Sequence, residues 1–152
     1  MAFEIDIRND QSLLPVDHAA IRRAVAVTLR EEHVRAAVIS ITLVDNAAIH
    51  RINREHLQHD YPTDVISFQL EFLPDEDGTI VEGEIIASAE MAVQMAPDCG
   101  WPAASELLLY IVHGLLHLCG YDDLTPPDKA VMRSREQHVL GTIGLKPVYP
   151  QD

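Results

Sequence analysis

AASELLLYIVHGLLHLCGYDD, residues 103–123, is the stretch that decides the fold. Over residues 103–119 apolar side chains occur all around the predicted helix, which is typical of a helix buried inside the protein. Gly120 then suits the position just past a helix end, where the backbone often turns left-handed. We therefore expect a central, largely buried helix around which the other elements pack.

The rest of the chain mixes strand and helix patterns. Alternating or β-branched apolar residues predict strands over residues 3–9, 36–45, 63–70 and the second part of 73–88. Apolar residues at helical spacing predict helices over residues 15–32, 46–57, 89–97 and 125–140. The two last strands are close enough in sequence to form a hairpin.

Local signals place several helix starts. Pro15 suits a first helical turn, because its missing N–H has no partner there in any case. Asp45 or Asn46 can cap the second helix, Ser88 the third, and Thr125 the last. These signals predict an α+β protein with clear element boundaries.

Length and composition predict one domain over residues 1–152. The chain is 47% hydrophobic and shows no internal repeat or linker, so its elements should pack as a single unit. Residues 1–10 carry charges where a signal peptide needs an apolar segment, and no apolar run approaches the length of a membrane span. We expect a cytoplasmic protein with no membrane association.

Cys99 and Cys119 form no metal or redox pair and are expected to be buried thiols without a disulfide partner.

The charge is strongly acidic and unevenly distributed. The formal net charge is −13, of which residues 1–59 contribute −1 and residues 60–152 contribute −12. Such a balance argues against a protein that follows nucleic acid by bulk electrostatics, since that mode needs clustered Lys and Arg. An anionic substrate should approach the N-terminal half or be attracted by a metal ion.

Two histidines on the central helix predict a metal site. His113 and His117 are four residues apart, so both imidazoles project from one face of the helix. The turn after Gly120 can bring back Asp122 or Asp123 as a third ligand, as catalytic zinc sites with two histidines and one carboxylate require. The alternative is a pair of core histidines, with the aspartates capping the next helix.

The residues around the histidines exclude one familiar chemistry. Gly114 follows the first histidine, where zinc peptidases of the HExxH type carry their glutamate base. Glu106 lies seven residues before His113 on the same helical face and could orient an imidazole. Equally, it could only be a charge that favours the start of the helix dipole.

Three segments resemble the YbeY family. Residues 113–123 follow its signature His-Gly-x-x-His-Leu-x-Gly-Tyr-Asp-His at every fixed position except the last. The element Gly-Asp-Ile of the family is matched by residues 83–85. The Asn-x-x-Tyr-Arg-x-x-Asp-x-Pro-Thr-Asp-Val-Leu-Ser-Phe segment is matched at Asn53, Asp60, Pro62, Thr63, Asp64, Val65, Ser67 and Phe68. The likeness spans residues 45–140 in the expected order.

The resemblance implies a fold and a function. The fold is α+β, with a mixed, mostly four-stranded sheet packed against the central metal-bearing helix and surrounding helices. The function is that of a single-strand-specific endoribonuclease, dependent on one zinc ion, that matures the 3′ end of small-subunit ribosomal RNA and contributes to ribosome quality control. Ribosomal RNA and the small ribosomal subunit or its assembly factors are the implied partners, and His113 and His117 the implied metal ligands.

Two positions depart from the family pattern. Asp123 stands where the family usually has its third metal-binding histidine, and a carboxylate oxygen can ligate zinc at a similar distance. We therefore expect His113, His117 and Asp123 to be the metal ligands. Leu57 stands where the family usually has an arginine thought to act on RNA, and leucine cannot bind phosphate. Arg54, one turn back, and Arg51 are candidate replacements that would bind RNA. The alternative is that they are solvated surface residues.

Three side chains are candidates for proton transfer. They are His59, Glu106 and Asp122. A different class of function also fits the sequence, namely a noncatalytic ribosome-assembly factor whose metal is structural. The absent arginine and the acidic charge favour that alternative. Metal-dependent hydrolysis of another substrate is the third possibility.

Overall fold

The computed structural model describes residues 2–149 and contains one four-stranded sheet and five helices within them. The strands are β1 (Ala2–Asn9), β2 (Val34–Val44), β3 (Val65–Leu73) and β4 (Thr79–Ser88). The helices are α1 (His18–Glu31), α2 (Asn46–Leu57), α3 (Ala89–Cys99), α4 (Ala103–Leu118) and α5 (Pro126–Thr142).

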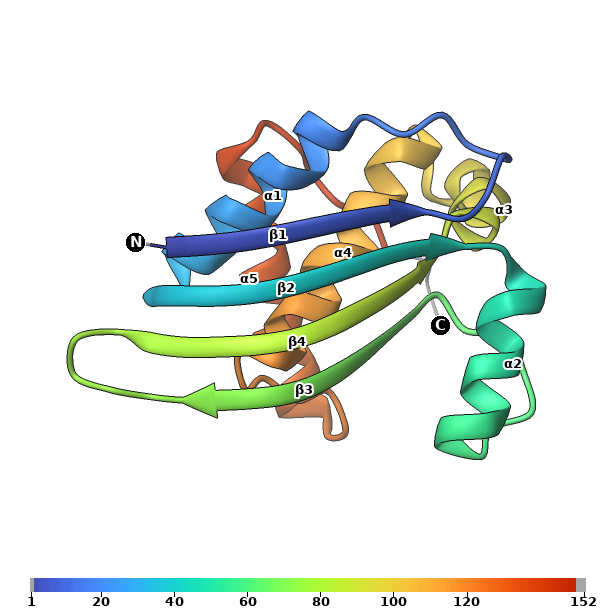
Figure 1. The fold of residues 1–152 in the computed structure, drawn as a ribbon. Coiled ribbons are helices and arrows are strands. Elements are labelled where there is room, and N and C mark those ends of the chain that lie inside the picture. The colour runs from blue at the N-terminus through green and yellow to red at the C-terminus, as the bar shows by residue number, and fades with distance from the viewer. Residues whose placement is uncertain (1, 150–152) are drawn as a thin grey trace.

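The sheet is mixed, in the order β1-β2-β4-β3. β1, β2 and β4 are parallel, whereas β3 runs antiparallel to β4 and forms a hairpin with it. Helices α1, α4 and α5 lie behind the sheet on one face, and α2 extends beyond the strand ends (Figure 1). The predicted α+β fold, its four-stranded mixed sheet and the hairpin are confirmed.

Helix α4 is the central helix, as its sequence predicts. Ile111 and Leu115 are fully buried against the sheet and α1, while Val112 and Leu116 are fully buried against α5. Gly114 lies between these residues, and a Cβ atom there would lie 3.2 Å from Val65 and 3.3 Å from Ile85. Glycine at this position therefore lets α4 approach β3 and β4 closely. The helical turns that carry His113 and His117 thus lie near the sheet.

Most of the predicted boundaries are confirmed, with one clear error. Asp45, Ser88 and Thr125 accept hydrogen bonds from the first turns of α2, α3 and α5. The helix expected from Pro15 begins at His18 instead. Asp17 is its cap, accepting a 3.2 Å bond from the backbone N–H of Ala20, so Pro15 lies in the preceding loop.

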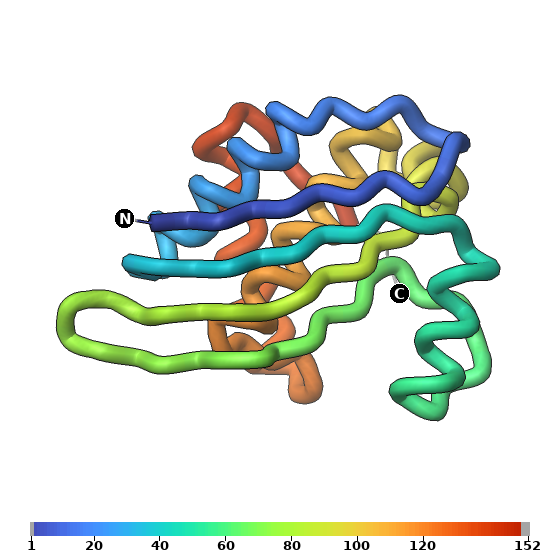
Figure 2. The backbone as a smooth tube through the Cα atoms, in the orientation of Figure 1, coloured from blue at the N-terminus to red at the C-terminus, as the bar shows by residue number. Residues whose placement is uncertain are grey.

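The segment that joins α2 to β3 runs back from the far end of the helix to the sheet (Figure 2). Gln58 ends α2 in a left-handed conformation with φ of 60°. Asn53, which is buried in α2, donates from its side chain to the carbonyl of Tyr61 over 2.9 Å, and its own carbonyl accepts from His59. These bonds tie the segment to the helix.

Within residues 2–149, no single helix is long and apolar enough to cross a membrane. Helices α3 and α4 meet that criterion only as a pair, and the chain bends by 113° between them.

Candidate metal centre

Three side chains converge at the C-terminal end of α4. The Nε2 atoms of His113 and His117 are 3.1 Å apart, because the two residues occupy successive turns of one helical face. Asp123 comes from the loop after α4, and its Oδ2 lies 3.2 Å from His113 Nε2 and 3.5 Å from His117 Nε2. All three side chains are half-buried, and together they could hold a metal ion.

The spacing of these atoms fits a tetrahedral zinc site. Zinc lies about 2.0–2.2 Å from imidazole nitrogen and carboxylate oxygen, so two ligand atoms of one tetrahedron are roughly 3.3–3.6 Å apart. The three distances in this group, 3.1, 3.2 and 3.5 Å, are close to that range. The side chains therefore need little movement to bind the ion.

The second nitrogen of each imidazole has a fixed partner. His117 Nδ1 donates to the backbone carbonyl of Tyr121 over 3.0 Å, and His113 Nδ1 donates to Oε2 of Glu136 over 2.6 Å. A carbonyl can only accept, so the proton of neutral His117 is on Nδ1 and its Nε2 carries a lone pair. Two such nitrogens and one carboxylate oxygen facing one point favour a cation between them.

Glu136 of α5 is the buried partner that positions His113. Its side chain is fully buried and also accepts from the Tyr149 hydroxyl over 2.8 Å. Burial lowers the pKa of His113, but the bond and charge of Glu136, together with the charges of Asp64 and Asp123, raise it overall. Sequence reasoning missed Glu136. The signal was a carboxylate at helical spacing among the buried residues of α5, which are Met132, Val139 and Leu140.

The loop after α4 distinguishes Asp123, the expected third ligand, from its neighbour Asp122. Gly120 has φ of 99°, a left-handed conformation that suits glycine, and the chain turns back there. Asp122 is exposed, and its Oδ1 accepts a 2.8 Å bond from the backbone N–H of Asp123. Asp123 is the residue that faces the histidines, and Asp122 shapes the loop that presents it.

Glu106 makes no hydrogen bond to either imidazole within the described part of the chain. It is only 5% exposed, and its Oε1 accepts a 2.7 Å bond from the indole N–H of Trp101. The contacts that orient the histidines come from Glu136 and Tyr121 instead. Of the two alternatives for Glu106, an orienting contact with an imidazole is therefore not the one seen, and its hydrogen bond goes to Trp101 near the start of α4.

Two pockets meet at the three candidate metal ligands. The first, which we call the Leu57 pocket, has a volume of about 320 Å³ and is lined by Leu57, Thr63, Asp64, Val65, Ile66, Ser67, His113, His117 and Asp123. The second, the Glu106 pocket, has a volume of about 480 Å³ and lies among α3, α4, α5 and the C-terminal segment. Both share Thr63, Asp64, His113 and Asp123, so the ligand group lies where they adjoin.

The candidate RNA contacts lie on α2 and the segment after it. Leu57, where the resemblance implies an arginine, lines the pocket that contains the candidate metal ligands. Arg51 and Arg54 are exposed on α2, and His59 is exposed with its ring 5.4 Å from that of Tyr61. None of these three lines the Leu57 or the Glu106 pocket.

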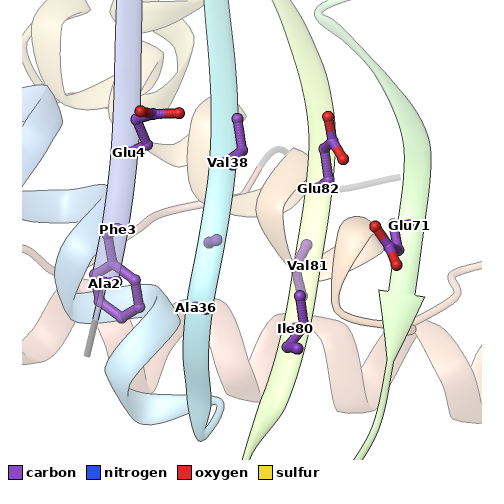
Figure 3. A pocket seen from close by; sticks show the side chains of 10 residues that line it. Ala2, Phe3, Glu4, Ala36, Val38, Glu71, Ile80, Val81 and Glu82 are labelled. Carbon is purple, nitrogen blue, oxygen red and sulfur yellow. The ribbon is translucent and has the colours of Figure 1, made fainter.

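A third pocket, of about 490 Å³, lies on the face of the sheet opposite the helices (Figure 3). Glu4, Glu71 and Glu82 stand around its small apolar side chains, which include Ala36 and Val38. No histidine lines it, and none of the metal ligands does. This pocket is therefore separate from the candidate metal ligands, which lie on α4 and the loop after it.

Both cysteines are free thiols. Cys99 is buried and Cys119 is partly exposed. Burial raises the pKa of Cys119 to about 12, so its thiol stays protonated at neutral pH.

Comparison with known proteins agrees with this geometry. The family model described as Endoribonuclease YbeY matches residues 6–144. An Endoribonuclease YbeY of Carboxydothermus hydrogenoformans is 40% identical over 93% of this chain and 98% of its own length. One of Rhodopirellula baltica is 47% identical over 71% of this chain and 55% of its own length.

A solved structure supports the fold as well. The solution structure of a Thermotoga maritima protein has a TM-score of 0.57 with 21% identity, covering 93% of this chain and 91% of that one. At this identity the likeness concerns the fold alone. By its sequence, the chain belongs to the YbeY endoribonuclease family.

Proposed function

We propose that the chain is a single-strand-specific, zinc-dependent endoribonuclease that works as one domain over residues 1–152. Its proposed task is 3′-end maturation of small-subunit ribosomal RNA and ribosome quality control in the cytoplasm. Ribosomal RNA and the small subunit or its assembly factors are the proposed partners. The observation that carries the proposal is the convergence of His113, His117 and Asp123 in a chain of an endoribonuclease family.

The three ligands would hold one zinc ion at the junction of the two pockets. Such an ion polarises a phosphoryl oxygen and makes a coordinated water more acidic. Asp123 in place of a third histidine adds one negative charge to the ligand set. The site should therefore accept harder ions such as Mn²⁺ more readily than a site of three histidines does.

The negative charges around the three ligands indicate that RNA binding at this site requires the metal ion. Asp64, Asp123 and Glu136 bring negative charge to the junction, and the net charge of the chain is −13. A phosphodiester would be repelled there without a cation. Arg51 and Arg54 on α2 are the proposed RNA contacts outside the pockets, where their exposed guanidinium groups can reach phosphates.

Proton transfer is proposed for three side chains. Asp122 is next to a ligand in the loop after α4, and Glu106 lines the pocket beside His113. His59 is exposed on the segment after α2, where it could exchange a proton with solvent. To find which of the three transfers a proton, each is replaced separately and the pH profile of RNA cleavage is measured.

Cleavage of single-stranded RNA tests the proposal. We expect the wild type to cut single-stranded RNA, to lose this activity with a chelator and to regain it with zinc. His117→Ala should be folded and inactive. Cleavage that resists both the chelator and His117→Ala would exclude the metal role.

A noncatalytic assembly factor with a structural metal is the second candidate. The observation in its favour is Leu57, which offers no charge to RNA at the metal pocket. Under this alternative, His113→Ala unfolds the chain, because the metal holds the fold together. Under the endoribonuclease proposal, the same variant stays folded and does not cut RNA, so circular dichroism and the cleavage assay separate the two.

A further inference from the structure

The Glu106 pocket has the shape and walls of a small-molecule site next to the metal ligands. Its volume of about 480 Å³ lies within the roughly 300–1,000 Å³ that such sites usually have. Its apolar walls come from Met91 and Met95 of α3 and from Leu109 and Tyr110 of α4. These side chains can pack against the flat faces of a planar ring.

The pocket is buried at one side and open at the other. Glu106, Leu109 and Tyr110 are all 6% exposed or less, so they form its inner wall. Lys129 and Val148 are exposed and lie at its entrance. A ligand with an apolar ring and an anionic group would place the ring inside and the charge at the entrance.

Glu106 supplies a hydrogen-bond acceptor on the inner wall. The indole N–H of Trp101 donates to Oε1, and the Tyr110 hydroxyl and the Cys99 thiol also face this carboxylate. A carboxylate has about four acceptor positions, so one remains for a ligand. The free carboxylate oxygen positions accept hydrogen bonds, so they favour ligands that present N–H groups. Amino groups of nucleobases are such donors. Uracil also carries an N–H, at N3, but this group lies between the O2 and O4 carbonyl oxygens, which a carboxylate repels.

Two cations lie on the side of α5. Lys129 has no ion pair within the described residues, so its ammonium group is available to a phosphate. Arg133 stacks its guanidinium 3.8 Å from the centre of the Tyr149 ring and lies 3.4 Å from Glu136. Arg133 therefore stiffens the wall, and Lys129 is the residue best placed to bind a backbone phosphate.

We infer that the Glu106 pocket binds the base of a nucleotide adjacent to the scissile phosphate, and that Glu106 selects a base bearing an amino group over uracil. The inference rests on the proposed function, because the metal ligands place the scissile phosphate at the pocket's edge. It also gives a physical reason for single-strand specificity. A base in a duplex is stacked and paired, so only an unpaired base can turn into the pocket.

Sequencing the cut ends of a random single-stranded RNA pool is the first test. With the wild type, uridine should be depleted about tenfold at one position next to the cut, since it lacks the amino donor that Glu106 accepts. Glu106→Gln should abolish that depletion, because an amide can donate to O4. Glu84→Gln, the same change on the exposed sheet face, should leave it intact.

Base preference separates recognition from a merely structural role. A structural, electrostatic or proton-transfer effect of Glu106→Gln would change the cutting rate for all four bases alike, and if it stops cleavage, the fluorescence of Trp101 compares the bases without cleavage. If the wild type cuts RNA without any preference against uridine, or if Glu106→Gln keeps that preference, the inference is wrong while the endoribonuclease proposal stands.

Fluorescence of Trp101 gives a second test that needs no RNA cleavage. Trp101 is the chain's one tryptophan and donates to Glu106, so a ligand in the pocket should change its emission. Cytidine 5′-monophosphate should bind about tenfold more tightly than uridine 5′-monophosphate, and Glu106→Gln should remove the difference. Equal affinities in the wild type would overturn the inference. If no RNA is cut but cytidine 5′-monophosphate is preferred, only the proposed function fails.

Discussion

Helices α4 and α2 both contribute to the Leu57 pocket, but the fold holds their side chains very differently. On α4, His113 and His117 each have one nitrogen bonded to a fixed partner, and the helix itself is buried between the sheet and α5. On α2, Leu57 is 41% exposed, and Arg54 is exposed without an ion pair in the described residues.

This difference assigns the two proposed roles to different helices, metal binding to α4 and RNA contact to α2. A change at His113 or His117 disturbs bonds that packing has already fixed, so it should be costly. A change on α2 alters charge at the surface and leaves the core intact. Leu57 lies on α2, where a substitution leaves the core intact. The chain can therefore lack an arginine at this position and keep the arrangement of His113, His117 and Asp123.

The largest expected effect comes from matched truncations on the two helices. His117→Ala should lower RNA cleavage by more than about 100-fold, because replacing even an outer partner of a metal ligand costs about 10–100-fold. Leu57→Ala should change cleavage by less than about threefold. Rates on one single-stranded RNA measure both. A similar loss from both variants would show that the two helices do not differ as described.

The next effect concerns the buried partner of His113. Glu136→Gln should weaken zinc binding by about 10–100-fold, because the amide orients the imidazole less strongly and carries no charge. Competition with a zinc-binding dye measures the affinity. Tyr149→Phe removes another bond to Glu136 and spares the one to His113, so it should have little effect. Equal zinc affinity in wild type and Glu136→Gln would count against a positioning role.

Acidification should release the metal. Only neutral His113 can bind the metal. Because the pKa of His113 is raised above the ordinary histidine pKa of about 6.5, protons compete with the metal at a higher pH than they would for an ordinary histidine. Zinc affinity should therefore fall as the pH drops through the raised pKa, by up to about tenfold per pH unit for one proton displaced. Zinc titration at a series of pH values measures this. An affinity that stays constant through that range would contradict the expectation.

The smallest effect should come from restoring charge on α2. Leu57→Arg should tighten binding of single-stranded RNA a few-fold and steepen the salt dependence by about 0.7 in the log–log slope, as one added phosphate contact does. Val38→Arg adds the same charge at a residue that is 44% exposed on the opposite sheet face. If both variants strengthen RNA binding equally, position 57 has no special access to RNA.

The sequence predicted the elements whose signals are local. The apolar run of α4, the caps at Asp45, Ser88 and Thr125, and the β3–β4 hairpin depend on neighbouring residues. The start of α1 was wrong because Pro15 and Asp17 both offer a helix start, and the cap bond of Asp17 decides between them. Such competition between two nearby signals is not settled by the sequence pattern.

The site was predictable only in part, for a related reason. His113 and His117 share a helix, so their spacing determines their proximity. Spacing alone could not separate Asp123 from Asp122, because the conformation of the loop after Gly120 determines which one turns inward. The resemblance to the family signature was what favoured Asp123. The spacing of Glu136 among the buried residues of α5 could have indicated that it is buried, but its contact with His113 depends on the packing of α5 on α4.

A crystal structure of the zinc-loaded protein, with anomalous scattering to locate the ion, tests the central claim most directly. The expected result is one zinc ion about 2.0–2.2 Å from His113 Nε2, His117 Nε2 and a carboxylate oxygen of Asp123. An ion elsewhere, or Asp123 turned to solvent while the histidines bind zinc, would contradict it.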